Sequence, residues 1–392
     1  MRFADFLFER LPGVTSSAEP FAAVAYEAEL RAKNDALRVF WQAASLPGAP
    51  KQIIPAVVPR NYRTTSKRRV TVHGRSGVSL GFAESKAVGA AVSALDLAAH
   101  NRIYHAIYQK LSTPAFGGLA RALNWIILRG DLDRRCLILN ICRMDGQTVR
   151  KAKLLAERLA EAEPCVTAAL LYFDPTRSDY YLTAERPRSA VDLKHLFGPR
   201  LLTLKVDGLN LKYPPTAFSQ VNEAMVPSLV KTARELLQVR NTERLIDLYC
   251  GYGLFSFALG REAAETLGME LTGESIATAV ETARRQFAHA RFRFIPTRIT
   301  DASLAQKLPT RNATLPEVVL LDPPRQGAAP GVIETIAARK PARVLQICCG
   351  TDEIVPAVRT WISTGYRVDT VQPMDLFPGT AGLETLILLS KA

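Results

Sequence analysis

The sequence predicts an α/β protein whose C-terminal half is a doubly wound, seven-stranded sheet, with a smaller α+β domain before it. Three observations predict this fold. Seven short apolar segments follow residue 215, helical segments lie between the first six of them, and only the loop LFPGTAG separates the last two. Parallel strands need helical crossovers, whereas strands joined by a short loop pair antiparallel. The last strand is therefore expected to run antiparallel in an otherwise parallel sheet.

Each expected strand is a short apolar run that ends at a turn. The seven runs are residues 244–250, 269–275, 291–299, 318–324, 343–349, 366–375 and 383–390. The helical segments repeat their apolar residues at the spacing of one helix face. They are residues 223–239, 254–268, 275–290, 330–340 and 352–365.

The chain divides along its length into three parts. Residues 1–45 read as helical, and Pro47 and Gly48 end that run. Residues 46–212 alternate strand-like runs with helical stretches such as 148–163, which favours an α+β domain. The strand-like runs of this part are residues 68–74, 124–131, 135–143, 165–174 and 178–185. Residues 213–392 form the third part, the doubly wound domain.

The charge balance favours a nucleic-acid partner. The 392 residues include 50 lysines and arginines against 37 aspartates and glutamates, a formal net charge of +13. A basic surface attracts phosphate backbones through counterion release, although a solubility effect is the alternative. No apolar stretch approaches the roughly 18 residues of a membrane helix, and charges interrupt the apolar start of the chain. We therefore expect a cytoplasmic protein with no membrane contact, and a monomer.

The cysteines do not predict a metal site. The six are Cys136, Cys142, Cys165, Cys250, Cys348 and Cys349. Their spacing matches neither zinc nor iron–sulfur patterns, so no metal cluster is expected. Cys136 and Cys142 lie in an apolar stretch and are expected to be buried, inert thiols.

A basic segment opens the α+β part of the chain. It holds Arg60, Arg63, Lys67, Arg68, Arg69 and Arg75, with Tyr62 among them. Arginines beside an aromatic ring suit phosphate contact combined with base stacking. The alternative is a solvated, charged strand edge, and the sequence favours neither interpretation.

A glycine loop after the first strand of the C-terminal sheet predicts a site for a methyl donor. Gly251 and Gly253 let the backbone turn tightly against a ligand. Position 256 is serine, so the dinucleotide pattern with a third glycine is incomplete. Glu274, expected at the end of the second strand, could accept both hydroxyls of a ribose. The sequence therefore favours an adenosine-containing methyl donor over a nicotinamide dinucleotide.

Asp322, Pro323 and Pro324 follow the fourth strand. The prolines stiffen the chain, and so hold the aspartate over the cleft. An acid followed by two prolines recurs at this place in methyltransferases that act on nucleobases. Because a carboxylate accepts a hydrogen bond, Asp322 would favour uracil, whose N3 is a donor, over cytosine.

Cys349 ends the fifth strand, directly before a helix. A thiolate that adds to C6 of uracil makes C5 nucleophilic, and a base must then remove the C5 proton. A helix N-terminus lowers the pKa of a thiol, so we expect a lowered pKa at Cys349. Glu384 begins the last strand, and an antiparallel strand would bring it to the same edge as a proton acceptor. Without that context, a packing role for the cysteine and a solvated carboxylate are the plain alternatives.

These motifs together resemble the RNA uracil-C5 methyltransferases, which make 5-methyluridine in transfer or ribosomal RNA. The resemblance rests on Phe218-Ser-Gln220-Val-Asn222, Leu248-Tyr249-Cys250-Gly251, Asp322-Pro-Pro-Arg325-Gln-Gly327 and Asp375-Leu-Phe-Pro378 followed by Glu384. The resemblance implies a class I methyltransferase domain that uses S-adenosylmethionine, and a central RNA-binding domain that begins in the basic segment.

The resemblance also implies roles for single residues. Gln220, Tyr249, Glu274 and Asp322 would contact the methyl donor or the uracil, Cys349 would be the nucleophile, and Glu384 the proton acceptor. The family usually has Ser-Cys-Asn-Pro at the nucleophile, whereas this chain has Cys348-Cys349-Gly350-Thr351. Two other functions stay open: methylation of cytosine C5 or of a base nitrogen, and RNA binding with a vestigial site.

Overall fold

The computed structural model describes residues 2–11, 13–14, 19–74, 77–83, 88–178, 193–287 and 291–392. The chain forms two compact units. Unit 1 comprises residues 1–59, 205–212 and 224–392, and unit 2 comprises residues 60–204 and 213–223. This division differs from the linear one expected at residues 45 and 212. The N-terminal segment up to residue 59 packs with the C-terminal sheet, and residues 213–223 pack with the α+β unit.

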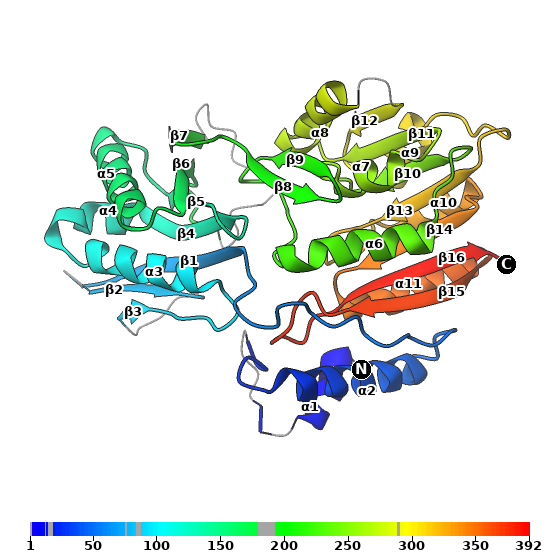
Figure 1. The fold of residues 1–392 in the computed structure, drawn as a ribbon, viewed down its shortest axis with the longest axis horizontal. Coiled ribbons are helices and arrows are strands. Elements are labelled where there is room, and N and C mark those ends of the chain that lie inside the picture. The colour runs from blue at the N-terminus through cyan, green and yellow to red at the C-terminus, as the bar shows by residue number, and fades with distance from the viewer. Residues whose placement is uncertain are drawn as a thin grey trace. The chain divides into compact units, whose positions relative to one another are not determined.

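The sheet of unit 1 has the topology that the sequence predicts (Figure 1). Its strands are β10 (Arg244–Leu248), β11 (Glu265–Glu270), β12 (Phe292–Pro296), β13 (Glu317–Leu321), β14 (Arg343–Cys348), β15 (Tyr366–Met374) and β16 (Glu384–Lys391). Their order is β12-β11-β10-β13-β14-β16-β15. The first five pair in parallel, and β16 runs antiparallel to both β14 and β15.

Helices cover both faces of this sheet. They are α6 (Val226–Leu237), α7 (Leu254–Gly260), α8 (Glu274–Gln286), α9 (Asp301–Lys307), α10 (Val332–Ala338) and α11 (Thr351–Ser363). Leu304, Ile336 and Ile354 of α9, α10 and α11 share one buried cluster with Ile246 and Val344 of the sheet. Helices α6, α7 and α8 contact the strands elsewhere on the sheet. Helix α9 occupies a connection where only a turn was expected.

One helix and one strand begin and end differently from the prediction. The expected helix 254–268 ends at Gly260, and β11 starts at Glu265 instead of residue 269. Gly260 explains the change, because a Cβ atom there would lie 2.3 Å from Oγ1 of Thr266. The close approach of these two residues requires a tight turn, and the chain enters the strand four residues early.

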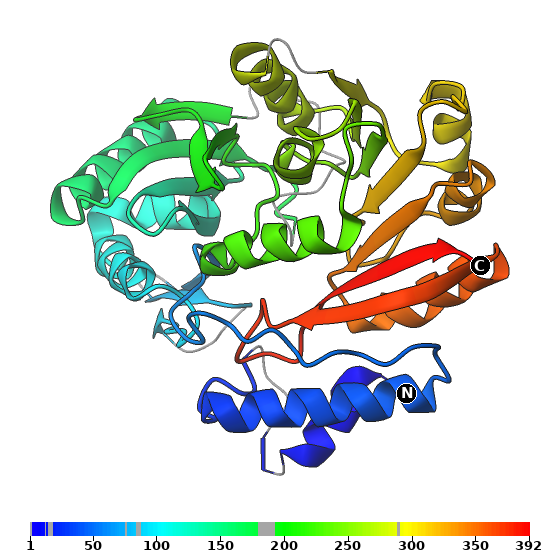
Figure 2. The same cartoon turned by 45° about the vertical axis from the view of Figure 1, so that its right-hand side comes forward.

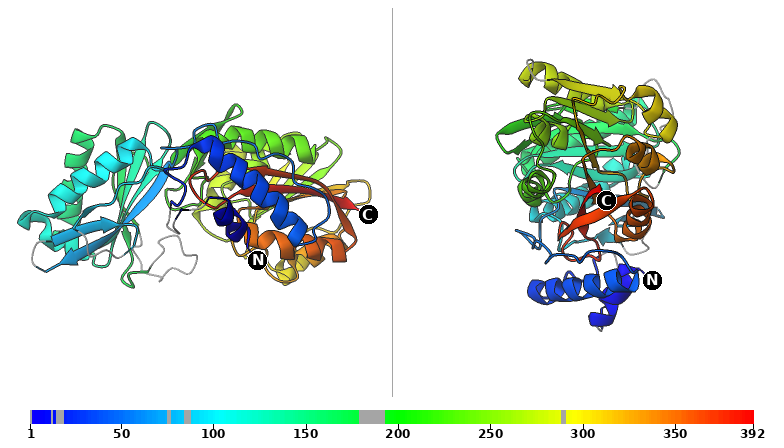
Figure 3. Two further views of the ribbon diagram at one scale, coloured as in Figure 1. Left: turned by 90° about the horizontal axis from the view of Figure 1, so that it is seen from below. Right: turned by 90° about the vertical axis from the view of Figure 1, so that its right-hand side faces the viewer.

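The N-terminal segment of unit 1 contributes α1 (Phe3–Arg10) and α2 (Tyr26–Ala43). The two helices lie at the β15 end of this unit, drawn in blue in Figure 2 and seen from other sides in Figure 3. Phe3, Leu37 and Phe40 pack in one cluster with Leu383, directly before β16. Residues 50–54 run parallel to β15 through the bridges Pro50–Val371 and Ile54–Met374.

A buried ion triad joins α2 to the loop between β15 and β16. Nζ of Lys33 lies 2.8 Å from a carboxylate oxygen of Glu29 and 2.8 Å from one of Asp375, and all three side chains are fully buried. Glu29 also accepts a 2.6 Å hydrogen bond from the backbone N–H of Gly379. Helix α2 therefore fixes the position of the loop that precedes Glu384.

Unit 2 is a second seven-stranded sheet covered by helices. Its strands are β1 (Thr65–His73), β2 (Gly77–Gly81), β3 (Gly89–Ala90), β4 (Leu123–Gly130), β5 (Arg135–Ile141), β6 (Val166–Phe173) and β7 (Leu193–Phe197), in the order β3-β2-β1-β4-β5-β6-β7. Its helices are α3 (Ala98–Leu111), α4 (Gly117–Ala122) and α5 (Gly146–Ala162), with the short helix η1 (Pro114–Phe116). All three pack in one apolar cluster with the sheet. The α+β prediction is met in this unit, and the expected strand 178–185 lies almost wholly outside the described residues.

The remaining elements are the two-stranded sheet of β8 (Leu202–Val206) and β9 (Leu209–Tyr213) and the short helix η2 (Glu223–Met225). Within the part of the chain that the structure describes, no helix has both the length and the apolar character that a membrane crossing needs.

Candidate active site

The chemistry-bearing residues of unit 1 gather where the parallel strands end. Asp322 follows β13 and Cys349 follows β14, while Glu384 is the first residue of β16. The antiparallel register pairs Cys348 with Thr385, so the end of β14 lies beside the start of β16. The expectation that these three residues share one edge of the sheet is met. Cys348 is fully buried in the apolar cluster below that edge, whereas Cys349 is half-buried.

The glycine loop after β10 has positive φ angles, which few residue types other than glycine adopt readily. Gly251 and Gly253 have φ values of 56° and 92°, and Tyr249 has 66°. A Cβ atom on Gly253 would lie 2.5 Å from the ring of Phe257. Glycine is therefore required at 253 on two grounds, conformation and space. The loop closes directly over the end of β10.

The acidic residue at the end of the second strand is Glu270, and the sequence interpretation that chose Glu274 was wrong about this position. Strand β11 ends at Glu270, while Glu274 is the first residue of α8 and is exposed. The Glu270 carboxylate accepts hydrogen bonds from the backbone N–H groups of Gly251, at 3.0 Å, and Leu271, at 2.7 Å. Burial raises the pKa of Glu270, and these two bonds oppose the shift.

Asp247 is a second acid that the sequence interpretation missed. It is fully buried under the glycine loop, and Oγ of Ser256 donates a 2.5 Å hydrogen bond to Oδ2. Burial raises the pKa of Asp247 to about 7, and the nearby Glu270 adds to the shift. Ser256, which replaces the third glycine of the dinucleotide-binding pattern, is therefore the hydrogen-bond partner of Asp247. The position of Asp247 inside the motif Asp-Leu-Tyr-Cys-Gly could have identified it as a site residue.

Carboxylates surround the Cys349 thiol. Burial raises the pKa of Cys349 far above its usual range, and Glu384, Glu353 and Asp322 raise it further, while Arg325 lowers it. The expected lowering by the helix N-terminus is therefore wrong for this protein. The partial positive charge of one helix end is outweighed by burial and by three acids.

Glu353 belongs to this group although the sequence interpretation did not name it. It lies in the first turn of α11, four residues after Cys349, and its Oε1 accepts a 3.0 Å bond from the N–H of Gly350. Burial raises the pKa of Glu353 to about 7, and its bonds to Gly350 and Cys349 oppose the shift. Its place one helical turn after the cysteine is the signal that could have found it.

Glu384 is fully buried, and among the described residues neither of its carboxylate oxygens has a hydrogen-bond partner. Burial raises the pKa of Glu384 well above its usual range, and the charges of Asp322 and Glu353 raise it further. Burial likewise raises the pKa of Asp322, and Asp247 is the next cause. These acids do not converge in a way that would hold a metal ion, in the part of the chain that the structure describes.

The site therefore gathers buried carboxyl groups whose ionisation is opposed by burial and by one another. Oδ1 of Asp247 and both oxygens of Glu384 are buried acceptors without a hydrogen bond from any described residue. A buried acceptor costs about 1–3 kcal/mol when it stays unsatisfied. The arrangement suits a ligand that brings N–H or O–H donors and positive charge.

Gln220 belongs to unit 2, in the segment 213–223, and it is half-buried. The segment is attached to β1, because the backbone N–H of Thr64 donates to the carbonyl of Val221 at 2.9 Å. Its predicted contact with a methyl donor remains a prediction.

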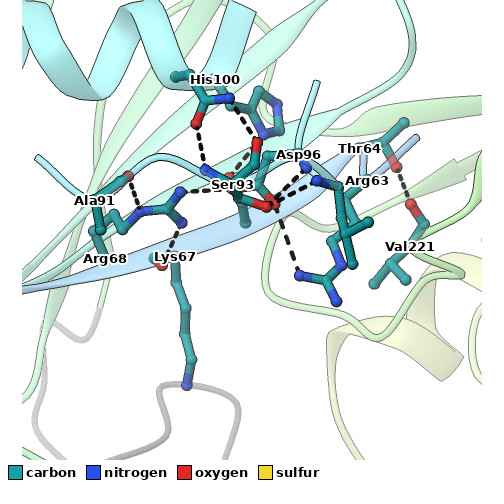
Figure 4. A network of polar contacts seen from close by, with 12 residues as sticks. Arg63, Thr64, Lys67, Arg68, Ala91, Ser93, Asp96, His100 and Val221 are labelled. Atoms are coloured by element: carbon teal, nitrogen blue, oxygen red, sulfur yellow. Dashed lines mark hydrogen bonds and ion pairs between the residues drawn. The ribbon is translucent and has the colours of Figure 1, made fainter. Parts of the chain in front are cut away.

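Arg68 is not available to RNA, which corrects the sequence interpretation of the basic segment. It is 1% exposed, and its guanidinium pairs with Asp96 at 2.8 Å and donates to the carbonyl of Ala91 at 2.9 Å (Figure 4). The ring of Tyr104 lies 4.5 Å from the guanidinium carbon. Strand alternation turns Arg68 toward α3. Tyr62, the aromatic residue in the base-stacking alternative, is 1% exposed.

The other basic residues of this segment are at least partly accessible. Arg60, Arg63, Lys67 and Arg69 are all half-buried. Lys67 and Arg69 alternate with Arg68 on β1, and both lie over the ring of Trp125, at 4.4 and 5.5 Å. Arg75 lies outside the described residues. Of the two cysteines expected to be buried, Cys136 is buried and Cys142 is half-buried.

Comparison with known proteins identifies the C-terminal half of the chain. Residues 201–392 match the family model of tRNA (uracil-5-)-methyltransferases. An uncharacterised RNA methyltransferase of Thermosynechococcus vestitus is 33% identical over 199 residues, which cover 50% of this chain and 42% of that protein. The 23S rRNA (uracil(1939)-C(5))-methyltransferase RlmD of Pectobacterium atrosepticum is 33% identical over 183 residues, or 47% of this chain and 40% of RlmD. The matched part of the chain thus spans less than half of the length of these two curated relatives.

Among solved structures, the tRNA (uracil-54, C5)-methyltransferase of Pyrococcus abyssi, in complex with S-adenosyl-L-homocysteine, has the same fold. The TM-score is 0.70 at 16% identity, and the likeness covers 96% of this chain and 87% of that chain. The sheet of unit 1 is accordingly the class I methyltransferase sheet. Its strand order and its glycine loop agree with the match of residues 201–392 to the family model of tRNA (uracil-5-)-methyltransferases.

Proposed function

We propose that this protein transfers a methyl group from S-adenosylmethionine to C5 of a uridine in structured RNA, either transfer or ribosomal, through a covalent bond between Cys349 and C6. The observation that carries the proposal is the meeting of Cys349, Asp322 and the unpartnered Glu384 at one sheet edge. A thiol, a buried base and an acceptor for uracil N3–H are what C5 methylation requires. The family match and the fold support the same reaction.

The loop after β10 and the acid after β11 are the proposed holders of the methyl donor. Gly251 and Gly253 leave room for close backbone approach, and Glu270 would accept the ribose hydroxyls. Tyr249 would lie against the same ligand. The donor's hydroxyls, ammonium and sulfonium supply the N–H, O–H and positive charge that this acceptor-rich site lacks. When bound, the donor offers an electrophilic methyl carbon to C5.

The reaction would begin with transfer of the Cys349 proton to the Glu353 carboxylate, which shares a hydrogen bond with this thiol. The thiolate Sγ then adds to C6 of the uracil, the C5–C6 double bond opens, and negative charge collects on C5 and O4. Asp322 would accept the N3–H bond and fix the ring. Once C5 carries the methyl group, Glu384 takes the C5 proton. That electron pair restores the double bond and expels Sγ as thiolate, so one proton is released per methyl group.

The electrostatics of the site suit this order of events. The acids keep Cys349 a neutral thiol in the free protein, because each disfavours a second negative charge. A cationic ligand reverses that balance, so the thiolate would form when the donor is present. Burial raises the pKa of Glu384, so this carboxyl must first lose its own proton, which a bound cationic donor would favour, before it can take the C5 proton.

Unit 2 is the proposed RNA-binding part. Arg60, Arg63, Lys67 and Arg69 would contact phosphates, and Arg68 would support the strand from inside. The net charge of +13 favours the same partner.

The test uses transfer-RNA and ribosomal-RNA transcripts that contain 5-fluorouridine, with S-adenosylmethionine present. Because fluorine cannot leave as a proton does, the protein–RNA adduct should persist and migrate as one band under denaturing conditions. Cys349→Ala should abolish the adduct, while the matched change Cys348→Ala should retain it. Glu384→Gln should form adduct on ordinary uridine RNA and release it slowly. Binding of both transcripts without any adduct from the unaltered protein would contradict the proposal.

A further inference from the structure

Unit 2 contains a cavity of about 480 Å³. It lies between β1, the junction of α4 with β4, and the loop after β6. Its lining includes Arg69, Arg121, Asn124, Trp125 and Arg177. Cavities of a few hundred Å³ accommodate small ligands of nucleotide size.

The lining is strongly basic. Arg69, Arg121 and Arg177 contribute three guanidinium groups, and the lining includes neither aspartate nor glutamate. Arg121 and Arg177 are exposed side chains. Guanidinium groups that converge on one space without a counter-charge favour a phosphate group.

The loop that carries Arg177 is built to hold it in an unfavourable conformation. Arg177 has a φ of 54°, which side-chain-bearing residues seldom adopt. Asp174 fixes the loop, since its carboxylate accepts bonds from the N–H and hydroxyl groups of both Thr176 and Ser178. Nη2 of Arg177 donates to the carbonyl of Arg121 at 2.8 Å, which joins the two arginines. Strain of this kind persists where the surroundings enforce it, and binding sites are a common place for it.

Trp125 and Asn124 line the floor of the cavity. Trp125 donates through Nε1 to the carbonyl of Ser178 at 3.0 Å, and the side chain of Arg69 lies over its ring. Asn124 is 4% exposed, and its Oδ1 has no hydrogen-bond partner among the described residues. Its Nδ2 donates to Oδ1 of Asn140 at 2.7 Å and to the carbonyl of Asp174 at 3.0 Å, which ties this residue to the loop that carries Arg177.

We propose that this cavity is a second RNA subsite, which binds one phosphate-bearing nucleotide of the substrate. Arg121 and Arg177 hold the phosphate, and Arg69 adds charge. The inference rests on the proposed function for the identity of the substrate. It adds to that function a contact that anchors the RNA by its backbone, separate from the nucleotide that is methylated.

The test measures binding of a fluorescent twelve-residue oligouridylate between about 0.05 and 0.5 M salt. The double variant Arg121→Gln/Arg177→Gln is compared with Arg150→Gln/Arg158→Gln, which removes two exposed arginines of α5 in the same unit. Each lost phosphate contact on single-stranded RNA reduces the slope of log K against log salt by about 0.7. Because the two arginines hold one phosphate, the slope should fall by about 0.7, and affinity at 0.1 M salt by about 5-fold. The α5 pair should change little.

An unchanged slope in the Arg121/Arg177 variant, an equal fall in the α5 variant, or no salt-dependent binding by the unaltered protein would each overturn the subsite. Adduct formation with 5-fluorouridine RNA at saturating concentration separates this inference from the proposed function. A double variant that retains the adduct but loses affinity supports both. A salt slope that falls as expected, without adduct from any protein, supports the subsite and contradicts the methylation chemistry.

Discussion

The buried ion triad of unit 1 makes a quantitative prediction. Replacing Lys33 by methionine keeps the length of the side chain and removes its charge. Two fully buried carboxylates, Glu29 and Asp375, then lose a cation that lies 2.8 Å from each. Because these acids stay out of water, the variant retains the cost of burying them without the compensating attraction.

Loss of one partner from a buried ion pair costs about 3–5 kcal/mol. A folding unit of roughly 150–250 residues loses about 2–4 °C in Tm for each kcal/mol. The Tm of Lys33→Met should therefore fall by about 6–20 °C. The matched control is Lys51→Met, because Lys51 is exposed in the same segment and its loss should be nearly neutral.

The deficit should also depend on pH. Burial already raises the pKa of Asp375, and Lys33 opposes that shift, so the variant's Asp375 should bind its proton still more tightly. A carboxyl whose pKa is raised by folding contributes its stability fully below the unfolded pKa, near 4, and loses it as pH rises through the folded value. The gap between Lys33→Met and the unaltered protein should therefore widen from about pH 5 to pH 8.

Calorimetry or circular dichroism at the two pH values measures both effects. The reasoning is refuted if Lys33→Met melts within about 2 °C of the control at pH 8, or if its deficit is larger at pH 5. Partial loss of adduct formation at a temperature where the variant is folded would show that the triad also sets the loop before Glu384.

Three further predictions follow from the candidate site. Gly253→Ala should lower the Tm and weaken S-adenosylhomocysteine binding in calorimetry, because its Cβ would lie 2.5 Å from the Phe257 ring at a φ of 92°; unchanged binding and Tm would show that the loop yields. Glu270→Gln should reduce the affinity for S-adenosylhomocysteine roughly tenfold or more, because the ribose loses a charged acceptor. Glu274→Gln is the control and should change the affinity little. Equal effects of the two substitutions would show that Glu270 does not bind this ligand. Alkylation of Cys349 by iodoacetamide should keep rising with pH beyond about pH 9 in the free protein, because the thiol pKa is raised; mass mapping that shows a plateau below about pH 8 would contradict this.

The sequence predicts the sheet of unit 1 well, because each strand is an apolar run and local spacing determines each helix. It also predicts which edge holds Asp322, Cys349 and Glu384, since topology alone brings the strand ends together. Glu270 was missed for a local reason. The run Met-Glu-Leu-Thr-Gly-Glu offers two acids four residues apart, and only the packing of Gly260 on Thr266 decides that the strand ends at the first.

Two other errors came from interactions distant in sequence. A run of basic residues does not reveal that Arg68 turns inward to Asp96, since the partner lies 28 residues later. The pKa of Cys349 depends on Asp322 and Glu384, which come from two other strands. A helix N-terminus beside the thiol was visible in the sequence, but the acids that outweigh it meet only in the folded chain.

The short run of residues 50–54 beside β15 has a consequence for solubility. Strand β15 is the last strand of its sheet, and such a border strand presents unpaired backbone groups that can recruit another chain. The bridges from Pro50 and Ile54, with bonds from the N–H groups of Lys51 and Ile54 to β15 carbonyls, occupy part of that border. Residues 50–54 thus cover part of this edge and hinder self-association of the sheet. A protein shortened to the family-matched region would lose this cover and would be prone to aggregate through β15.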